Sequence, residues 1–280
     1  MYHFGRVLFA ITLAVVTIFP VYSQVSTTCP DYDYTKIKLV TFDCFAALMQ
    51  WENSMFDNVA EILPSLTSSQ VHDLVTKWEG KYGNAQGTRF EEKQTGAFPF
   101  SWYISTQLQP ILDDMKITVT RDEYDQLVKS WGNLRPWTNT QATLEKILNA
   151  NITIAVLSNG DKNTLSNAVT VFPSTVTFTY IFSSDFPAGV FKPQHDIYEQ
   201  AKTVGYDVSE ILHVAGGPTD GHGAYDAGLF SAVTSSKSFT NHAALSGASD
   251  GSVTAKTGDT TCFELGDISE VTEILGLGPL

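Results

Sequence analysis

Four polar positions in this chain follow apolar runs and could together form a hydrolytic site. Asp43 follows "KLVTF", Ser158 and Asn159 follow "ITIAVL", Lys192 lies in "GVFKP", and Asp220 comes soon after "ILHVAG". A carboxylate at the end of a strand can act as a covalent nucleophile, and a lysine beside it would favour its charged form. We therefore expect Asp43 to be the nucleophile and Lys192 to hold it charged.

The remaining polar residues have supporting roles in this hypothesis. Ser158 and Asn159 would hydrogen-bond the nucleophile or orient the substrate. Asp220 would position the lysine or help to activate the water that hydrolyses an ester intermediate. A Ser-Asn pair after a strand is ordinarily a turn or a helix cap. The evidence for a site is that polar residues follow four different predicted strands.

These residues converge only if the chain forms a parallel sheet. Apolar runs at 37–42, 152–157, 177–184, 211–216 and 229–233 predict strands, with helical patterns between them. This alternation is typical of an α/β protein with a Rossmann-like parallel sheet core. In such sheets the ligand site lies beyond the carboxyl ends of the strands, which is where the four positions fall.

The segment 51–134 has helical periodicity and no convincing strand, which predicts an inserted all-helical cap domain. The predicted division is a core of residues 24–48 and 136–280 with a cap of residues 49–135. The expected helix N-caps are Ser68 or Ser69, Thr120, Thr140 and Asp267, and Gly205 is an expected C-cap.

The first residues have the pattern of a targeting segment. A basic residue, an apolar run of about thirteen residues and small residues before position 24 predict a signal peptide over residues 1–23. The alternative is a membrane anchor, but the run is shorter than the ~20 residues that span a bilayer. We therefore expect a secreted protein, extracellular or in the secretory lumen, with no membrane association after cleavage. The net charge of −13 argues against nucleic acid or an anionic membrane as the main partner but does not select a substrate. The partner that we expect is a small-molecule substrate.

The chain has three cysteines and one glycosylation sequon. Cys44 is expected to be buried, whereas Cys29 and Cys262 would pair in an oxidising compartment. Asn151 opens the sequon Asn-Ile-Thr beside a predicted strand, where access is expected to be poor. The polar stretch 236–261 predicts a long surface loop.

The order of "FDCFAAL", "VLSNG", "GVFKPQHDIYEQA" and "HVAGGPTDGHGAYDAGL" resembles the haloacid dehalogenase superfamily, and within it the L-2-haloacid dehalogenase branch. The resemblance covers roughly residues 36–233. It implies hydrolytic cleavage of a carbon–halogen bond in an (S)-2-haloacid through an aspartyl ester, without a metal or another cofactor. By the same resemblance, Asp43 is the nucleophile and Tyr198 lines the site with Ser158, Lys192 and Asp220.

Phe45 bears on the type of reaction. Phosphatases of the superfamily place a second aspartate two residues after the nucleophile, where it transfers a proton and its backbone helps to bind Mg²⁺. A phenyl ring cannot transfer a proton, and an aromatic residue at this place resembles the dehalogenases. We also expect Phe45, Trp51, Asn159 and Tyr198 to contact the substrate.

Several positions depart from the family pattern. The family usually has Gly-Thr where this chain has Ala46-Ala47, and Ser-Ser-Asn where it has Ala215-Gly216-Gly217. By spacing, Glu79 stands where the family has an arginine for its carboxylate substrate. At ~4 Å and an effective dielectric near 20, about 4 kcal/mol of repulsion would replace attraction. Arg89 is a candidate to reach into the site instead.

Two alternatives follow from these departures. The chain could be a non-catalytic secreted protein on the same fold, or a phosphatase with altered acid and base groups. The histidines and cysteines have no metal-ligand spacing, and His222 is expected to be a loop residue. The resemblance also allows a homodimer, by analogy alone.

Overall fold

The computed structural model describes residues 29–234 and 261–280. The predicted signal peptide lies outside the described residues, and so does almost all of the loop predicted at 236–261. In the described part, six parallel strands form one sheet in the order β3-β2-β1-β4-β5-β6. The strands are β1 (Leu39–Phe42), β2 (Thr153–Leu157), β3 (Tyr180–Phe182), β4 (Ile211–Ala215), β5 (Phe230–Thr234) and β6 (Phe263–Leu265).

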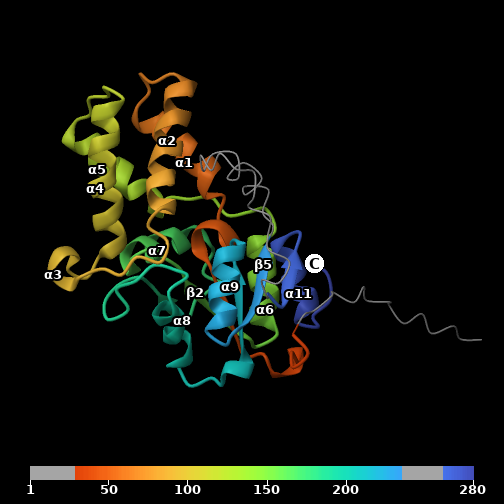
Figure 1. The fold of residues 1–280 in the computed structure, drawn as a ribbon. Coiled ribbons are helices and arrows are strands. Elements are labelled where there is room, and N and C mark those ends of the chain that lie inside the picture. The colour runs from red at the N-terminus through yellow and green to blue at the C-terminus, as the bar shows by residue number, and fades with distance from the viewer. Residues whose placement is uncertain (1–28, 235–260) are drawn as a thin grey trace, which may run out of the picture.

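The helices fall into two sets, as Figure 1 shows. Those of the segment between β1 and β2 stand above the sheet: α1 (Trp51–Ile62), α2 (Ser68–Gly83), α3 (Glu92–Thr95), α4 (Pro99–Asp114) and α5 (Arg121–Lys129), followed by α6 (Thr140–Asn149), which returns to the core. The rest belong to the core: α7 (Lys162–Ala168), α8 (His195–Lys202), α9 (Pro218–Asp226) and α11 (Val271–Ile274). The predicted parallel α/β core is confirmed.

Two apolar clusters cover the two faces of the sheet. Along β1, Val40 and Phe42 pack into the cluster that contains α6 and α11, while Leu39 belongs to the cluster on the α8 side. Successive residues of a strand point to opposite faces, so Thr41 also faces the α8 side. Continuous burial along β1 therefore reflects a sheet that is covered on both faces.

The segment above the sheet joins the core at two adjacent connections. Met49 forms an antiparallel bridge with Pro136. The backbone N–H of Gln50 donates to the carbonyl of Arg135 at 2.7 Å, and that of Trp137 donates to the carbonyl of Leu48 at 3.1 Å. The predicted domain boundaries at 48/49 and 135/136 stay predictions, but the chain enters and leaves the helical segment at this one place.

The helix caps were partly predictable. Thr120 caps α5 with a capping box, as predicted. The prediction for α2 was wrong, because Thr67 is its cap and Ser68 and Ser69 are its first residues. A Thr-x-x-Gln capping box, with the glutamine three residues later, was the missed signal. Thr140 is the first residue of α6 and not its cap, because its hydroxyl donates to a carbonyl of the segment that leads into α1.

Of the caps predicted near α8 and α11, the one at Gly205 was wrong and the one at Asp267 is confirmed. The helix α8 ends at Lys202, so Gly205 is not its C-cap, although its φ of +92° turns the chain just beyond. A positive φ of this kind favours glycine. Asp267 accepts from the backbone N–H of Ser269 at 2.9 Å and caps the turn before α11, as predicted.

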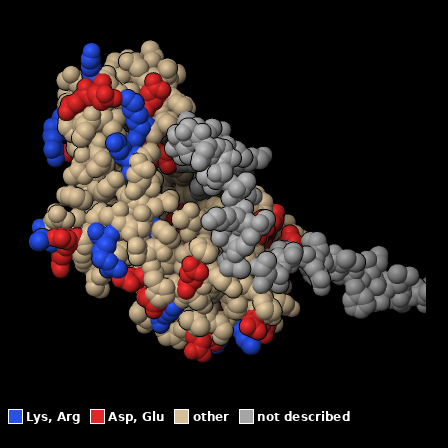
Figure 2. Space-filling view, in the orientation of Figure 1, with Lys and Arg blue, Asp and Glu red and all other residues tan. Residues whose placement is uncertain are grey.

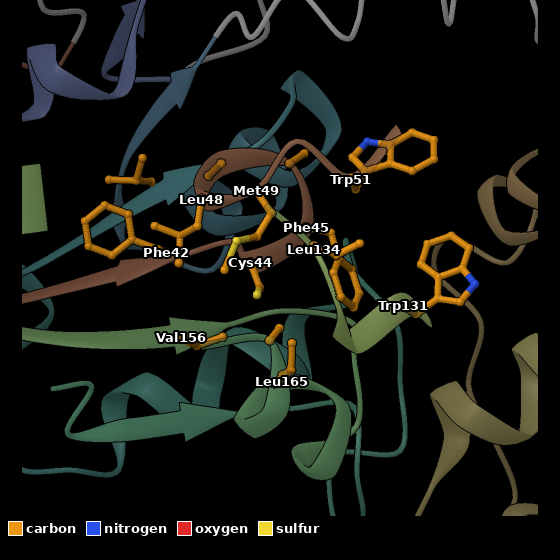
Figure 3. Packing of buried hydrophobic residues seen from close by; sticks show 14 of the residues in the cluster. Phe42, Cys44, Phe45, Leu48, Met49, Trp51, Trp131, Leu134, Val156 and Leu165 are labelled. Atoms are coloured by element: carbon orange, nitrogen blue, oxygen red, sulfur yellow. The ribbon is translucent and has the colours of Figure 1, made fainter. Parts of the chain in front are cut away.

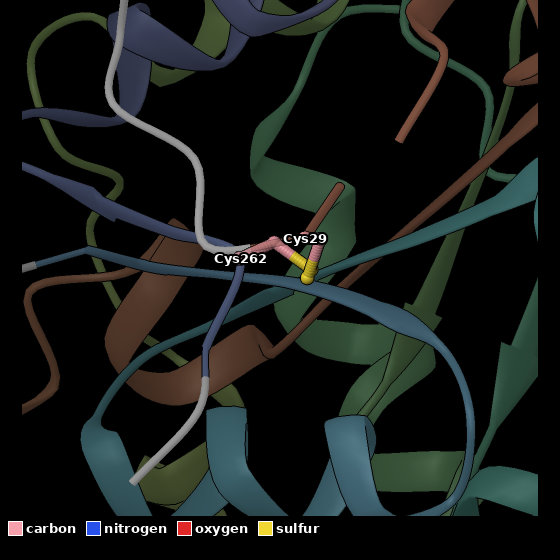
Figure 4. The surroundings of a disulfide bond; sticks show 2 residues. All are labelled: Cys29 and Cys262. Atoms are coloured by element: carbon pink, nitrogen blue, oxygen red, sulfur yellow. A yellow bond between two sulfur atoms is a disulfide. The ribbon is translucent and has the colours of Figure 1, made fainter. Parts of the chain in front are cut away.

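A disulfide joins Cys29 to Cys262, with an S–S distance of 2.00 Å, and confirms the predicted pairing (Figure 4). It ties the segment before β1 to the residue that precedes the edge strand β6. Cys44 is buried and free, also as predicted. Asn151 is exposed in the turn between α6 and β2, so the expectation of poor access was wrong.

The surface bears both signs of charge despite the acidic balance. Figure 2 shows Lys and Arg interspersed with Asp and Glu over the helices above the sheet. Within residues 29–234 and 261–280, no helix combines the length and the apolar character needed to cross a bilayer.

Candidate active site

Asp43 stands at the carboxyl end of β1 and is held by the turn that follows it. Residues Cys44–Leu48 form a single π-helical turn, and Asp43 is its N-cap. The Asp43 Oδ2 atom accepts from the backbone N–H of Ala46 at 2.9 Å and from that of Ala47 at 3.4 Å. The backbone N–H groups therefore fix one oxygen of a residue that is only 9% exposed.

The other oxygen of Asp43 receives two side-chain donors. Ser158, at the end of β2, donates from Oγ to Asp43 Oδ1 at 3.0 Å. Lys192 donates from Nζ to the same oxygen at 3.1 Å and to Asp220 Oδ2 at 2.8 Å. One ammonium group thus bridges two carboxylates, and the four residues predicted to carry the chemistry are brought together.

The charges of this cluster depend on one another. Burial by itself lowers the pKa of Lys192, but Asp220 and Asp43 outweigh burial and raise it above its ordinary value. For Asp220, burial raises the pKa, but Lys192 and His213 hold it well below its usual range. Lys192 is therefore a cation and Asp220 an anion at neutral pH.

The loop that carries Lys192 is clamped by the segment after α2. Backbone hydrogen bonds link Gly87 N–H to the carbonyl of Lys192 at 2.8 Å and Phe90 N–H to the carbonyl of Gly189 at 2.8 Å. Asn159 adds a third link, because its Oδ1 accepts from the Lys192 N–H at 2.7 Å. These contacts fix the backbone of Lys192, and its side chain then reaches both carboxylates from a fixed position.

Asn159 also reaches the helices above the sheet. Its Nδ2 donates to the hydroxyl of Tyr82, at the end of α2, at 3.1 Å. Sequence reasoning missed Tyr82, because a tyrosine near the end of an amphipathic helix reads as an ordinary packing residue. Asn159 therefore positions Lys192, contacts Tyr82 of α2 and lines the cleft.

Asp220, which follows β4 as expected, lies in the first turn of α9. Its Oδ1 accepts from the hydroxyl of Tyr198 at 2.8 Å and from Nε2 of His213 at 3.1 Å. Tyr198 is fully buried on α8 and does not line the cleft, so the structure does not place it in contact with substrate as expected. Tyr198 instead supports Asp220 from the side of α8.

A cleft of about 1100 Å³ opens above Asp43, between the carboxyl ends of the strands and the helices of the cap segment. Phe45 and Trp51 line it, as predicted, together with Trp131, which sequence reasoning missed. Trp51 and Trp131 stack with their planes 6° apart and their centroids 6.1 Å apart, and Phe45 lies edge-on to Trp131 (Figure 3). The wall beside Asp43 is therefore aromatic.

The small residues around Asp43 have a steric role. A Cβ on Gly216 would lie 2.4 Å from the Ala46 Cβ and 2.8 Å from Asp43 Oδ2, so only glycine fits there. Ala47 contributes its backbone N–H in place of a hydroxyl. Ala215 is buried in β4, and Gly217 lines the cleft without a side chain. At these positions this chain has small apolar groups and backbone where the family pattern has hydroxyl and amide side chains.

The structure shows whether two charged residues, Glu79 and Arg89, reach the cleft. Glu79 lines the cleft, together with Lys77, Lys81 and Asp114. Arg89 does not reach in, because its guanidinium pairs with Asp196 on α8 at 2.7 Å, outside the cleft. In the described part of the chain, no arginine lines this cleft.

Neither His222 nor any cluster of metal-binding side chains in the described residues belongs to the cleft. His222 lies on α9 and not in a loop, and it pairs with Asp226 at 3.1 Å, away from the cleft. Across the described residues there is no group of three or more His, Cys, Asp or Glu side chains that could hold a metal ion. The space between Asp43 and Asp220 is filled by the Lys192 ammonium.

Comparison with known proteins agrees with this geometry. Residues 96–234 match the family model described as haloacid dehalogenase-like hydrolase. The match begins in the segment between β1 and β2, so it includes Ser158, Lys192 and Asp220 but not Asp43. No curated protein matches the chain in sequence.

Solved structures share the fold over most of the chain. An L-2-haloacid dehalogenase from Xanthobacter autotrophicus has a TM-score of 0.68 at 19% identity, over 86% of this chain and 98% of its own. Its form with chloropropionic acid covalently bound has a TM-score of 0.67 at 18% identity, with the same coverage of 86% and 98%. A defluorinating L-2-haloacid dehalogenase has a TM-score of 0.67 at 21% identity, over 86% and 95%.

At these identities the structural likeness shows the fold alone. Together the two comparisons confirm the predicted resemblance: residues 96–234 are similar to haloacid dehalogenase-like hydrolases, and the described chain has the fold of the L-2-haloacid dehalogenases.

Proposed function

We propose that this chain is a hydrolase that attacks a small organic substrate with Asp43 and passes through a covalent aspartyl ester, without a metal ion. The observation that carries the proposal is the bridge from Lys192 Nζ to Asp43 Oδ1 at 3.1 Å and to Asp220 Oδ2 at 2.8 Å, at the floor of an open cleft. A buried carboxylate with a fixed counter-cation and a route to solvent is suited to nucleophilic catalysis.

The first step forms the ester. A carboxylate oxygen of Asp43 bonds to an electrophilic carbon of the substrate, and the leaving group, such as a halide, departs with the bonding electron pair. The donors on the Asp43 oxygens, from Ser158, Lys192 and two backbone N–H groups, hold the carboxylate in one orientation. Such fixed geometry lowers the entropic part of the barrier.

The second step regenerates the enzyme. Water adds to the carboxyl carbon of Asp43, the bond from that carbon to the ester oxygen breaks, and an alcohol leaves. One proton of the water passes to the departing alkoxide and the other to solvent, so the net reaction turns an organic halide and water into an alcohol, a halide ion and a proton. The N–H groups of Ala46 and Ala47 are positioned to hold the oxyanion that forms in this step.

Asp220 is better suited to positioning Lys192 than to acting as the base. It already accepts from Lys192, Tyr198 and His213, and its pKa is held well below the usual range although burial opposes this. A general base works best with a pKa near the operating pH. The attacking water would therefore lose its proton to solvent in the open cleft.

The charges of the cleft favour an uncharged substrate over a carboxylate. By spacing, Glu79 takes the place of an arginine in the resembling family. It lines the cleft with Lys77 and Lys81, of which Lys77 pairs with Asp114, and Arg89 is committed to Asp196. We propose that the amide of a 2-haloacid reacts faster than the acid itself. A higher rate of halide release from 2-chloropropionate than from 2-chloropropionamide would contradict this.

Phosphatase activity has less support. Phe45 stands two residues after the nucleophile, is 5% exposed and stacks on Phe100 with centroids 5.2 Å apart, so no proton donor is available at this position. Mg²⁺-dependent release of phosphate from a generic ester would overturn this conclusion.

The ester intermediate is directly testable. Wild-type protein, Asp43→Asn and the control Asp226→Asn, which changes an exposed acid on α9, are incubated with 2-bromopropionate and 2-bromopropionamide. We expect wild type and the control to release halide and to form an adduct on the peptide that contains Asp43. In water labelled with heavy oxygen, repeated turnover should place the label in that carboxylate. A wild-type protein that forms no adduct and releases no halide would instead support a non-catalytic role.

We also propose that the protein is secreted. The Cys29–Cys262 disulfide supports this, because such bonds form and persist in oxidising compartments. Recovery of both cysteines as free thiols by peptide mapping of native protein without reduction would contradict it. A homodimer stays an expectation by analogy, which light scattering after gel filtration would measure.

A further inference from the structure

His213 is a buried histidine that the proposed mechanism does not use directly. It lies in the middle of β4, its side chain is fully buried, and it pairs in register with Thr41 on β1. Its Nδ1 is 2.9 Å from Thr41 Oγ1, and its Nε2 is 3.1 Å from Asp220 Oδ1. An imidazole in the interior of a parallel sheet is costly unless both nitrogens are hydrogen-bonded, and here both are.

The contacts select one protonation pattern. An ionised carboxylate can only accept hydrogen bonds, so Nε2 of His213 must carry a proton and donate to Asp220. In the neutral ring Nδ1 is then an acceptor, and the Thr41 hydroxyl can donate to it. Asp220 therefore selects this tautomer, and the Thr41 hydroxyl satisfies the Nδ1 atom that remains.

The carboxylate of Asp220 is held from three directions. His213 on β4 and Tyr198 on α8 donate to Oδ1, and this leaves Oδ2 directed at Lys192. Lys192 in turn contacts Asp43. A continuous path of hydrogen bonds therefore runs from Thr41 through His213, Asp220 and Lys192 to the nucleophile.

We propose that His213 is a positioning residue: it keeps the Asp220 carboxylate ionised and aimed at Lys192, and through Lys192 it sets the reactivity of Asp43. This inference rests on the proposed function. His213 does not line the cleft, so it acts through Asp220 and not on the substrate.

Three variants test the role. His213→Phe keeps an aromatic ring but removes the donor, whereas His213→Gln retains an N–H that can reach Asp220. Thr41→Val has nearly the same volume but cannot donate to Nδ1, so it removes the hydrogen bond that orients the ring while Nε2 still faces Asp220. His222→Phe, on the same helix as Asp220 but paired with Asp226, is the matched control.

The readout is the rate of halide release and of adduct formation with 2-bromopropionamide. We expect kcat to fall about 10- to 100-fold in His213→Phe, the size of one hydrogen bond to a charged group, with KM unchanged. His213→Gln should recover most of the loss, Thr41→Val should lose less than His213→Phe, and the control should match wild type. A purely structural role would give no recovery with glutamine, and equal kcat in wild type and His213→Phe would overturn the inference.

Failure of this inference is separable from failure of the proposed function. If wild type forms no adduct, the proposed function fails, and urea unfolding then decides the positioning role by itself. His213 and Lys192 interact through Asp220, so the stability losses of His213→Phe and Lys192→Met should be non-additive in the double variant. Additive losses would overturn the inference whether or not the protein is active.

Discussion

Replacement of Lys192 by methionine tests the charge arrangement of the site most directly. Methionine has a similar length but no charge, so the variant leaves Asp43 and Asp220 without the cation between them. Both carboxylate side chains are only 13% exposed, and the lysine is 6% exposed. Removal of one partner from a buried ion pair costs about 3–5 kcal/mol. Because the cleft admits water, we expect a loss of about 3 kcal/mol in the free energy of unfolding at neutral pH.

The pH dependence of this loss has a definite sign. Burial alone would raise the pKa of Asp220, but Lys192 and His213 hold it well below its ordinary value. The stability that the ionised Asp220 contributes to wild type is therefore complete above its unfolded pKa of about 4 and is lost as the pH falls further. In Lys192→Met this contribution is reduced, so the difference from wild type should be largest near neutral pH and smaller in acid.

Urea unfolding followed by tryptophan fluorescence measures the effect. Lys77→Met is the control, because its ammonium pairs with Asp114 at the exposed rim of the cleft, and little change in stability is expected. The double variant Lys192→Met with Asp220→Asn should regain part of the lost stability, because it removes one of the two uncompensated charges. Unchanged stability of Lys192→Met at neutral pH, or no recovery in the double variant, would refute the reasoning.

Three further predictions concern the disulfide, the floor of the cleft and the glycosylation sequon. The Cys29–Cys262 bond closes a loop with a sequence separation of 233 residues, so chain entropy predicts a loss of about 5 kcal/mol in thermal unfolding of the double alanine variant; a loss below about 1 kcal/mol would contradict the entropic model. Gly216→Ala should abolish adduct formation because its Cβ has no room, whereas Gly80→Ala, a helical position with nothing within 4 Å, should add about 0.5–1 kcal/mol to stability. Asn151 is exposed in its turn, so protein from a eukaryotic secretory host should lose apparent mass on treatment with an N-glycosidase, and Asn151→Gln should not.

The predictable part of the site comes from positions at strand ends. Asp43, Ser158 and Lys192 could be placed together because the carboxyl ends of parallel strands meet at one edge of the sheet. Asp220 was also assigned to this edge of the sheet, although the proline and glycines before it conceal the start of α9. Helix caps were predictable where the hydroxyl residue and the acid formed an obvious box, as at Thr120, and were missed at Thr67.

The errors arose where a role depends on the direction of a side chain. Tyr198 was expected to contact substrate, but α8 presents it to the back of Asp220. Arg89 was a candidate cation for the cleft, but Asp196 on α8 holds it outside. Tyr82 and Trp131 escaped notice because they are apolar-face residues of helices that lie far from the nucleophile in sequence.

The sequence by itself determined the kind of fold, the proximity of Asp43 and Lys192 at the strand ends, and the absence of an acid two residues after Asp43. These are local properties, since they depend on residue type, on periodicity and on the order of motifs along the chain. Only the tertiary structure decided which side chains form hydrogen bonds and ion pairs with one another. Only the packing of β4, α8 and α9 brings His213, Tyr198 and Lys192 to the two oxygens of Asp220, and only the cleft shows that Glu79 lines the wall while Arg89 does not. Hydrogen bonds and Coulomb energies vary steeply over a few ångströms, and no spacing in the sequence specifies such distances.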